Sequence, residues 1–290
     1  VAWLLIMALL VAVMVVIGGI TRLTGSGLSM TEWRPLMGTL PPMSAAEWER
    51  VFALYKASAE YDAVNFGMDL AGFKKIFFWE YFHRLWGRLL GLAFALPLLG
   101  FWMAGRIPPG FGIRLIGLLV LGGFQGVIGW WMVKSGLSED ASVSQYRLAT
   151  HLGMALVIFS LLIWTALDIR DGRSPLPRGQ TAATIGIVGL TILAGALVAG
   201  MDAGLLYNEY PLMGSGIIPI EYGEQGLFDP FENPASAQFH HRWIAVLAVV
   251  AVLGLTFNAK KTNLSGGSAY FAIVAVAVQF LLGITTLLHG

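Results

Sequence analysis

Residues 77–94 read FFWEYFHRLWGRLLGLAF, and this stretch decides the fold. The run is apolar enough to lie in a membrane, yet it holds Glu80, His83, Arg84 and Arg88. Ionisable groups are costly in hydrocarbon and normally face the interior of a helix bundle. The stretch therefore predicts a transmembrane helix that carries a polar site on one of its faces.

The rest of the chain supports a membrane protein. Of its 290 residues, 57% are hydrophobic and only 12% are charged, whereas a soluble domain carries about a quarter charged residues. The apolar runs are continuous rather than alternating, which favours helices over a barrel. The expected fold class is an all-α membrane protein. Seven runs have the length of about 20 residues that a span needs: 2–20, 76–104, 113–133, 148–167, 181–200, 238–257 and 268–288.

Charge and cysteine content exclude several classes of function. The net charge of +1 gives no reason to expect a nucleic-acid partner. The chain has no cysteine, which excludes disulfides, iron–sulfur clusters and covalent haem attachment through a CxxCH motif.

The distribution of charge among the connections predicts the orientation in the bilayer. The 201–237 connection carries six acidic residues and no Lys or Arg. By the positive-inside rule, the N-terminus lies inside and the 21–75 and 201–237 connections lie outside. The first run lacks a cleavage pattern, so we interpret it as a retained helix. The basic residues of the opposite connections are Arg106, Arg114, Arg170, Arg173, Arg178, Lys260 and Lys261.

Four histidines fall at a similar expected depth in the outer part of the membrane. Each lies near the expected outer end of its apolar run: His83 in 76–104, His151 in 148–167, and His240 and His241 in 238–257. A planar cofactor with two axial ligands requires imidazoles at a common depth, and haem fits apolar walls. The alternative is that these imidazoles only make hydrogen bonds between helices.

The chain also contains an internal repeat. GLSMTEWRPLMG at 27–38 resembles GLLYNEYPLMG at 204–214, and YFHRLW resembles QFHHRW. The order of matching features predicts two tandem pseudo-symmetric four-helix bundles, 1–172 and 179–290. Seven helices are present. The eighth, with a fourth haem ligand, is expected beyond Gly290, and both ends of the chain look clipped.

Other polar residues near the histidines have two interpretations each. Arg84, Arg147 and Arg242 are candidates for haem propionates, or they extend toward the lipid headgroups. Glu80 lies three residues before His83, on the same helix face, and is a candidate proton carrier or general acid/base. The alternative role for Glu80 is a structural ion pair with Arg84 or Arg88. We expect Gln125 to be a packing residue, and His289 to lie where the last helix ends.

Several blocks together resemble one family. GGITRLTGSGLSMTEWRPLMGTLPP, WEYFHR, GWWMVKSGL and QFHHRW are similar to the haem A synthases, closest to the mitochondrial and alphaproteobacterial branch. The resemblance implies eight membrane helices in two bundles. It also implies oxidation of a methyl group of haem O to a formyl group, through two successive hydroxylations, giving haem A for cytochrome c oxidase.

The resemblance also implies roles for particular residues. His83 and His151 would hold the substrate haem as axial iron ligands, and Glu80 would be functionally required. His241 would bind the iron of a haem b, with His240 as a possible substitute. The expected location is the bacterial inner membrane, or the mitochondrial inner membrane in a eukaryote. Haem O synthase, an electron-transfer protein and further copies of this chain are the expected partners.

Two other classes of function remain open from the sequence. A b-type haem electron carrier that oxidises quinol shares paired histidines but needs no carboxylate for a substrate. A haem chaperone would also bind haem but would not convert it. A third, weaker alternative is an ion-coupled transporter that uses Glu80 and binds no haem.

Overall fold

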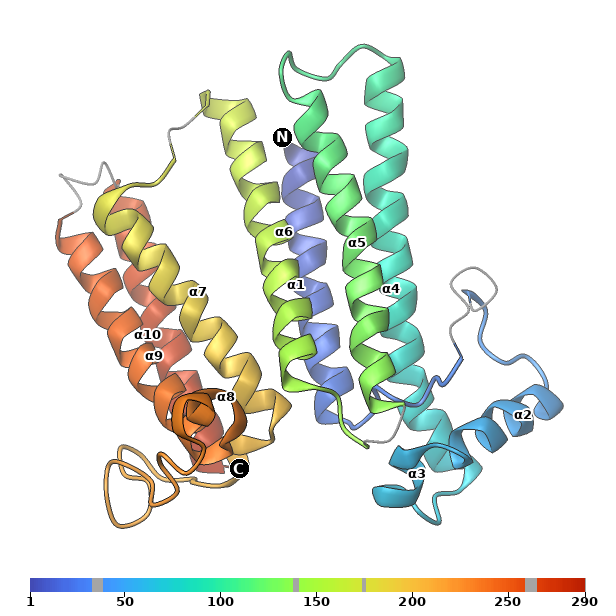
Figure 1. The fold of residues 1–290 in the computed structure, drawn as a ribbon. Helices are drawn as coiled ribbons and strands as arrows, with labels where there is room; N and C mark the ends of the chain where they lie inside the picture. The colour runs from blue at the N-terminus through green and yellow to red at the C-terminus, as the bar shows by residue number, and fades with distance from the viewer. Residues whose placement is uncertain (33–38, 138–140, 174–175, 259–264, 290) are drawn as a thin grey trace. The chain divides into compact units, whose positions relative to one another are not determined.

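The computed structural model describes residues 1–290 except 33–38, 138–140, 174–175, 259–264 and 290 (Figure 1). Within that part, seven helices are long and apolar enough to cross a membrane, which confirms the prediction of an all-α membrane protein. They are α1 (Ala2–Leu23), α4 (Leu70–Met103), α5 (Gly112–Gly136), α6 (Gln145–Asp171), α7 (Gly179–Gly200), α9 (Pro234–Phe257) and α10 (Gly266–His289).

The chain divides into two compact units, Val1–Ser174 and Pro175–Gly290. Unit 1 contains α1, α4, α5 and α6, and unit 2 contains α7, α9 and α10. In each unit the long connections lie at one end of the helices, which we call the loop end (Figure 1). The predicted division at 1–172 and 179–290 assigned one haem to each half, and that assignment remains a prediction.

Unit 1 is held together mainly at the end opposite the loop end. Side chains of α1, α4, α5 and α6 form its apolar core there, and two tryptophans add hydrogen bonds between helices. Trp3 Nε1 donates to the carbonyl of Ala93 at 3.0 Å, and Trp86 Nε1 donates to that of Leu10 at 3.1 Å. The buried core residues are Leu4, Met7, Ala8, Phe94, Leu98, Leu115, Leu118, Ile158, Leu162 and Ala166.

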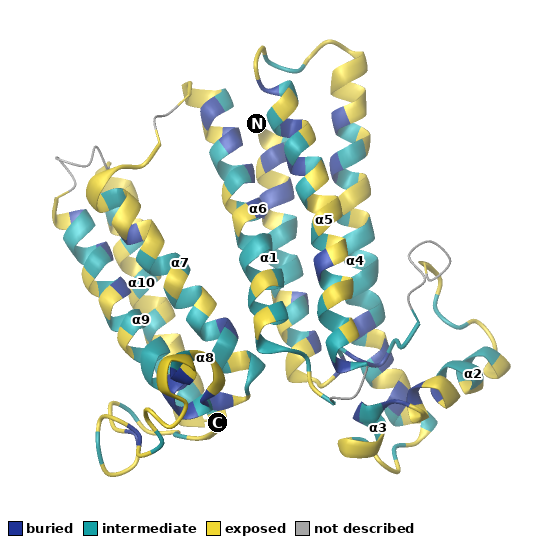
Figure 2. Cartoon of the chain, in the orientation of Figure 1, coloured by how far each residue is buried: buried dark blue, intermediate teal, exposed yellow. Residues whose placement is uncertain are grey.

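The connection before α4 forms the short helices α2 (Ala45–Lys56) and α3 (Ala59–Ala63). Serine side chains cap both N-termini, because each accepts a backbone N–H that has no partner in the helix. The two helices pack on the first turns of α4 through a cluster of buried aromatic rings (Figure 2). Its members are Phe52, Tyr55, Phe73 and Phe77.

In unit 2, α9 packs against both α7 and α10. The connection between α7 and α9 contains the 3-10 turns η2 (Ala203–Leu205) and η3 (Gly226–Phe228) and the single-turn helix α8 (Asp229–Glu232). Large apolar side chains are exposed along the sides of the long helices in both units, as expected for surfaces that face lipid (Figure 2).

The Asp229 carboxylate organises the connection in unit 2. It accepts hydrogen bonds from the backbone N–H groups of Gly223 at 2.9 Å and Gln225 at 3.1 Å, from Asn233 Nδ2 at 3.0 Å, and from the Ser236 hydroxyl. Burial alone would raise the pKa of Asp229, but these donors outweigh it and hold the pKa below its ordinary value. The connection is therefore an ordered structure tied to the first turn of α9.

Candidate functional site

The two histidines of unit 1 come from helices that α1 brings together. His83 lies on α4 and His151 on α6, both toward the loop end, and α1 packs against both of these helices. Whether the two imidazoles converge on one iron remains a prediction.

Gln125 is the polar partner of His151. From the sequence we expected Gln125 to be only a packing residue. Its Nε2 lies 3.2 Å from Nδ1 of His151 and donates to the His151 carbonyl at 2.9 Å. The signal available in the sequence was a lone amide side chain in the apolar helix α5. The Gln125 amide therefore contacts both the ring and the backbone of His151.

The two adjacent histidines of unit 2 have different environments. His241 Nδ1 lies 3.1 Å from the carbonyl oxygen of Thr191 on α7. A carbonyl only accepts, so Nδ1 carries the proton and the lone pair of Nε2 is available to a metal. His240 Nδ1 donates to the Ser236 carbonyl at 2.7 Å, and its ring stacks on Tyr222. His240 therefore faces the loop, which disfavours it as the iron ligand.

The helix segments around the histidines contain few buried side chains. On α4 no residue between Glu80 and Phe94 is buried, and on α9 none between Gln238 and Ala248 is buried. On α6 the buried positions begin only at Ile158. Imidazoles surrounded by apolar helix faces are the donors and walls that a haem needs, so the residue types present fit a haem. Among the described residues, no three His, Cys, Asp or Glu side chains gather as they would around a bare metal ion.

Glu80 is fully engaged by groups at the loop end of unit 1. Its Oε2 accepts from the Ser29 hydroxyl at 2.7 Å and from the Met30 backbone N–H at 2.6 Å, and its Oε1 pairs with Arg84. The predicted ion pair with Arg84 is therefore present. The carboxylate of Glu80 links α4 to the chain segment that follows α1.

Arg84 binds the same segment. Its guanidinium donates to the backbone carbonyls of Met30 at 3.0 Å and Glu32 at 3.3 Å. Arg147, the second propionate candidate, donates to the Trp131 carbonyl at 2.8 Å and lies over the Trp131 ring. Both guanidiniums hold backbone or aromatic groups at the loop end of unit 1.

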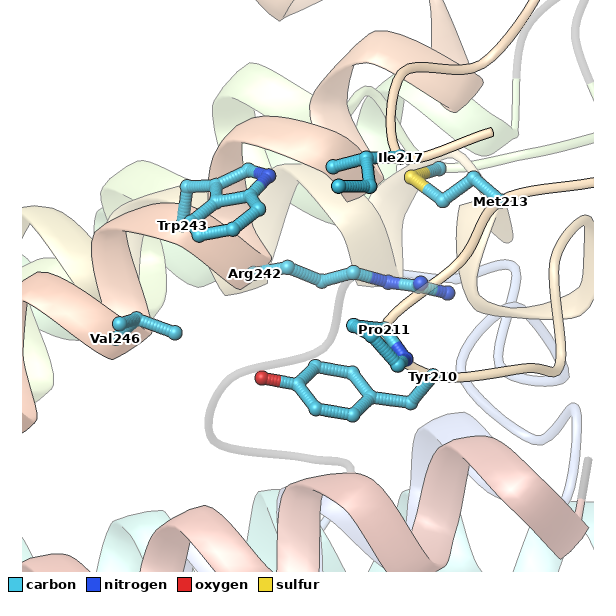
Figure 3. A pocket seen from close by; sticks show the side chains of 7 residues that line it. All are labelled: Tyr210, Pro211, Met213, Ile217, Arg242, Trp243 and Val246. Carbon is cyan, nitrogen blue, oxygen red and sulfur yellow. The ribbon is translucent and has the colours of Figure 1, made fainter.

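Unit 2 repeats the arginine contacts at matching positions. Arg242, which follows His241 as Arg84 follows His83, donates to the carbonyls of Tyr207 at 2.8 Å and Glu209 at 2.9 Å. Tyr207 and Glu209 lie as far after the Gly-Leu pair at 204–205 as Met30 and Glu32 lie after the Gly-Leu pair at 27–28. Figure 3 shows the Arg242 side chain reaching across a small cavity toward this loop. The cavity holds about 10 Å³ and is lined by Tyr210, Pro211, Met213, Ile217, Arg242, Trp243 and Val246.

One position of the repeat differs in chemistry. Gln238 precedes His241 by three residues, as Glu80 precedes His83, and its Nε2 donates to the Tyr207 carbonyl at 3.0 Å. An amide thus holds the loop in unit 2 where a carboxylate holds it in unit 1. Attachment of the loop alone does not require an acid at this position.

These observations define a multi-pass helical membrane protein with imidazoles on neighbouring helices near the loop end of each unit. The family model of the cytochrome oxidase assembly protein, COX15-CtaA, matches residues 1–290. The chain belongs to this family.

Curated relatives match almost the whole chain. The protein from Maricaulis maris named "Heme A synthase" is 47% identical over 294 residues, which cover 99% of this chain and 86% of the relative. The "Heme A synthase" of Caulobacter vibrioides is 48% identical over 297 residues, again 99% of this chain and 86% of the relative. That of Granulibacter bethesdensis is 48% identical over 298 residues, or 99% and 78%. No solved structure matches the chain significantly.

Proposed function

We propose that this protein is a haem A synthase, an oxidoreductase that converts a methyl group of haem O to a formyl group for cytochrome c oxidase assembly. The proposal rests on His83 and His151, which lie toward the loop end of two helices that both contact α1, and on the ion-paired Glu80 one helical turn from His83. The full-length similarity to relatives named "Heme A synthase" supports it. The bound substrate would be haem O, and the enzyme would lie in the bacterial inner membrane with its N-terminus inside.

In this proposal, unit 1 holds the substrate and unit 2 holds a resident haem b. His83 and His151 would bind the iron of haem O and so orient the substrate. His241 would bind the haem b iron through Nε2, because the Thr191 carbonyl accepts the Nδ1 proton. Haem b bound there would supply a route for electrons that leave the substrate.

Glu80 is the group of unit 1 that can move a proton near the substrate. Oxidation of a methyl group releases protons along with electrons, and a carboxylate one helical turn from His83 can accept them. Arg84 and the two donors from Ser29 and Met30 hold this carboxylate in place between transfers. The amide of Gln238 cannot accept a proton in this way, so the two units are expected to differ in chemistry.

Extraction of haem from the purified protein, after expression together with haem O synthase, tests this function. Wild-type protein is expected to yield haem A together with haem O. Glu80→Gln is expected to yield haem O with about 100-fold less haem A, the scale of a lost general acid/base, while it keeps its haem content. Glu49→Gln, an exposed change on α2, is the control. Haem b alone would identify an electron carrier, and unconverted haem O from wild type a chaperone.

Histidine variants test the ligands independently of turnover. His83→Ala and His151→Ala are expected to reduce retention of haem O, and His241→Ala to remove haem b. His289 is exposed at the end of α10, where its Nδ1 donates to the Thr285 carbonyl at 2.8 Å, so His289→Ala serves as the control. Retention of both haems in all three variants would refute the ligand assignment.

A further inference from the structure

Each histidine assigned to iron lies against a glycine of a neighbouring helix. A Cβ added to Gly129 on α5 would lie 2.9 Å from Cε1 of His151. One added to Gly195 on α7 would lie 2.8 Å from Cε1 of His241. Carbon atoms make favourable contact at about 3.5–4.0 Å, so neither ring could keep its place beside an alanine.

The third glycine–histidine contact, between Gly18 and His83 in unit 1, is slightly longer. A Cβ on Gly18 of α1 would lie 3.3 Å from Nε2 of His83. Gly18 and Gly195 occupy the same position in the internal repeat, because each lies nine residues before a Gly-Leu pair, at Gly27 and at Gly204. The two units thus use glycine at the same point for the same neighbour.

Close packing of helix backbones is the ordinary explanation for glycine in membrane helices. Here the contacts differ from that pattern. The atoms nearest to the added Cβ belong in every case to the imidazole ring: His83 for Gly18, His151 for Gly129, and His241 for Gly195. Other helix glycines, such as Gly126 on α5 and Gly189 on α7, have nothing within 4 Å.

We propose that Gly129 and Gly195 are positioning residues that seat the imidazoles of His151 and His241 for iron binding, and that Gly18 keeps side-chain atoms away from Nε2 of His83. The inference rests on the proposed function, since it assumes that these rings bind iron. In unit 2 the glycine contacts the Cε1 side of the ring and the Thr191 carbonyl holds Nδ1. Together they fix the ring plane and the direction of Nε2. A ligand whose plane is fixed before binding sets the geometry at the metal.

Alanine variants of full-length purified protein test the proposal, with matched controls on the same helices. Gly195→Ala and Gly129→Ala are compared with Gly189→Ala and Gly126→Ala. The readouts are the haem-to-protein ratio, the absorption and electron paramagnetic resonance spectra, and the midpoint potentials. Gly195→Ala and Gly129→Ala are expected to lose haem or to show shifted spectra and midpoint potentials. The two control variants are expected to match wild type. Gly18→Ala is expected to have a smaller effect, because its contact is looser.

A double-variant comparison separates this proposal from the proposed function. If His241→Ala keeps a wild-type haem b spectrum, the ligand assignment fails. If His241→Ala loses haem b but Gly195→Ala keeps the wild-type spectrum and potential, only the positioning role is overturned.

Thermal midpoints add a second readout. Gly195→Ala is expected to lower the midpoint of the protein that retains His241, because ring and Cβ compete for one space. In the His241→Ala background the same change is expected to leave the midpoint unchanged or to raise it, since alanine is the better helix former. An equal decrease in both backgrounds would contradict a role exerted through the imidazole.

Discussion

Replacement of Glu60 by Gln should make the short helices α2 and α3 more stable at alkaline pH. Glu60 is only 6% exposed, and its Oε2 has no hydrogen-bond partner among the described residues. Burial raises its pKa to about 7, partly offset by a hydrogen bond from the Tyr55 hydroxyl and reinforced by the negative charge of Glu80. The group therefore prefers to be protonated in the folded protein.

The size and sign of the effect follow from that pKa. A pKa change from the ordinary value of 4.5 to about 7 corresponds to a contribution of about 3 kcal/mol to the free energy of unfolding when Glu60 is protonated. Since the folded state binds the proton more tightly, this stability is fully present below pH 4.5. It is lost as the pH rises to about 7 and stays lost above that. Glutamine stays neutral, so Glu60→Gln removes the penalty at about pH 8 and changes little at about pH 5.

Hydrogen exchange of the α2 and α3 amides measures the effect locally. Protection in Glu60→Gln, corrected for the intrinsic exchange rate, is expected to exceed that of wild type by about 100-fold at about pH 8. The two proteins should converge at about pH 5, where Glu60 is protonated. Glu49→Gln, on the exposed side of α2, serves as the control. Reduced protection in Glu60→Gln at alkaline pH, or equal pH dependence in the two proteins, would show that the Glu60 carboxylate is stabilised after all.

Two further changes test contacts that hold each unit together. Asp168→Asn should destabilise unit 1 by about 2 kcal/mol in chemical denaturation, because the buried Asp168 carboxylate pairs with Arg114. Replacing both Asp168 and Arg114 by leucine should recover part of the lost stability. Additive losses of stability would argue against coupling between the two side chains. Arg242→Lys should speed proteolysis of the 204–216 segment several-fold, since a single ammonium cannot reproduce the planar fork from which two guanidinium nitrogens donate to three carbonyls. An unchanged cleavage rate, with Arg178→Lys as the control, would refute that role.

Some features of this protein follow from local composition alone. Seven apolar runs of sufficient length predicted seven spanning helices, because a segment in hydrocarbon must satisfy its backbone hydrogen bonds internally. The start of α4 was less accurate: the sequence placed it at residue 76, whereas the helix begins at Leu70. The cap provided by Asp69 and the aromatic contacts of Phe73 with α2 extend the helix beyond the apolar run.

At the candidate site, what the sequence predicts and what only the tertiary structure shows are more clearly separated. Residue type and helical spacing singled out His83, His151, His241 and Glu80, because ionisable groups are rare in membrane helices and therefore conspicuous. The same spacing could not show that Arg84 binds carbonyls of the segment after α1, since those atoms are remote in sequence.

By itself, the sequence determined the membrane class, the repeat and the identity of the polar residues, all of which depend on side-chain chemistry and short-range periodicity. Only the tertiary structure decided which nitrogen of His241 is free, that His240 faces the loop, and that Gly129 and Gly195 lie against imidazole rings. Those features depend on contacts between helices, and the packing of one helix on another sets them.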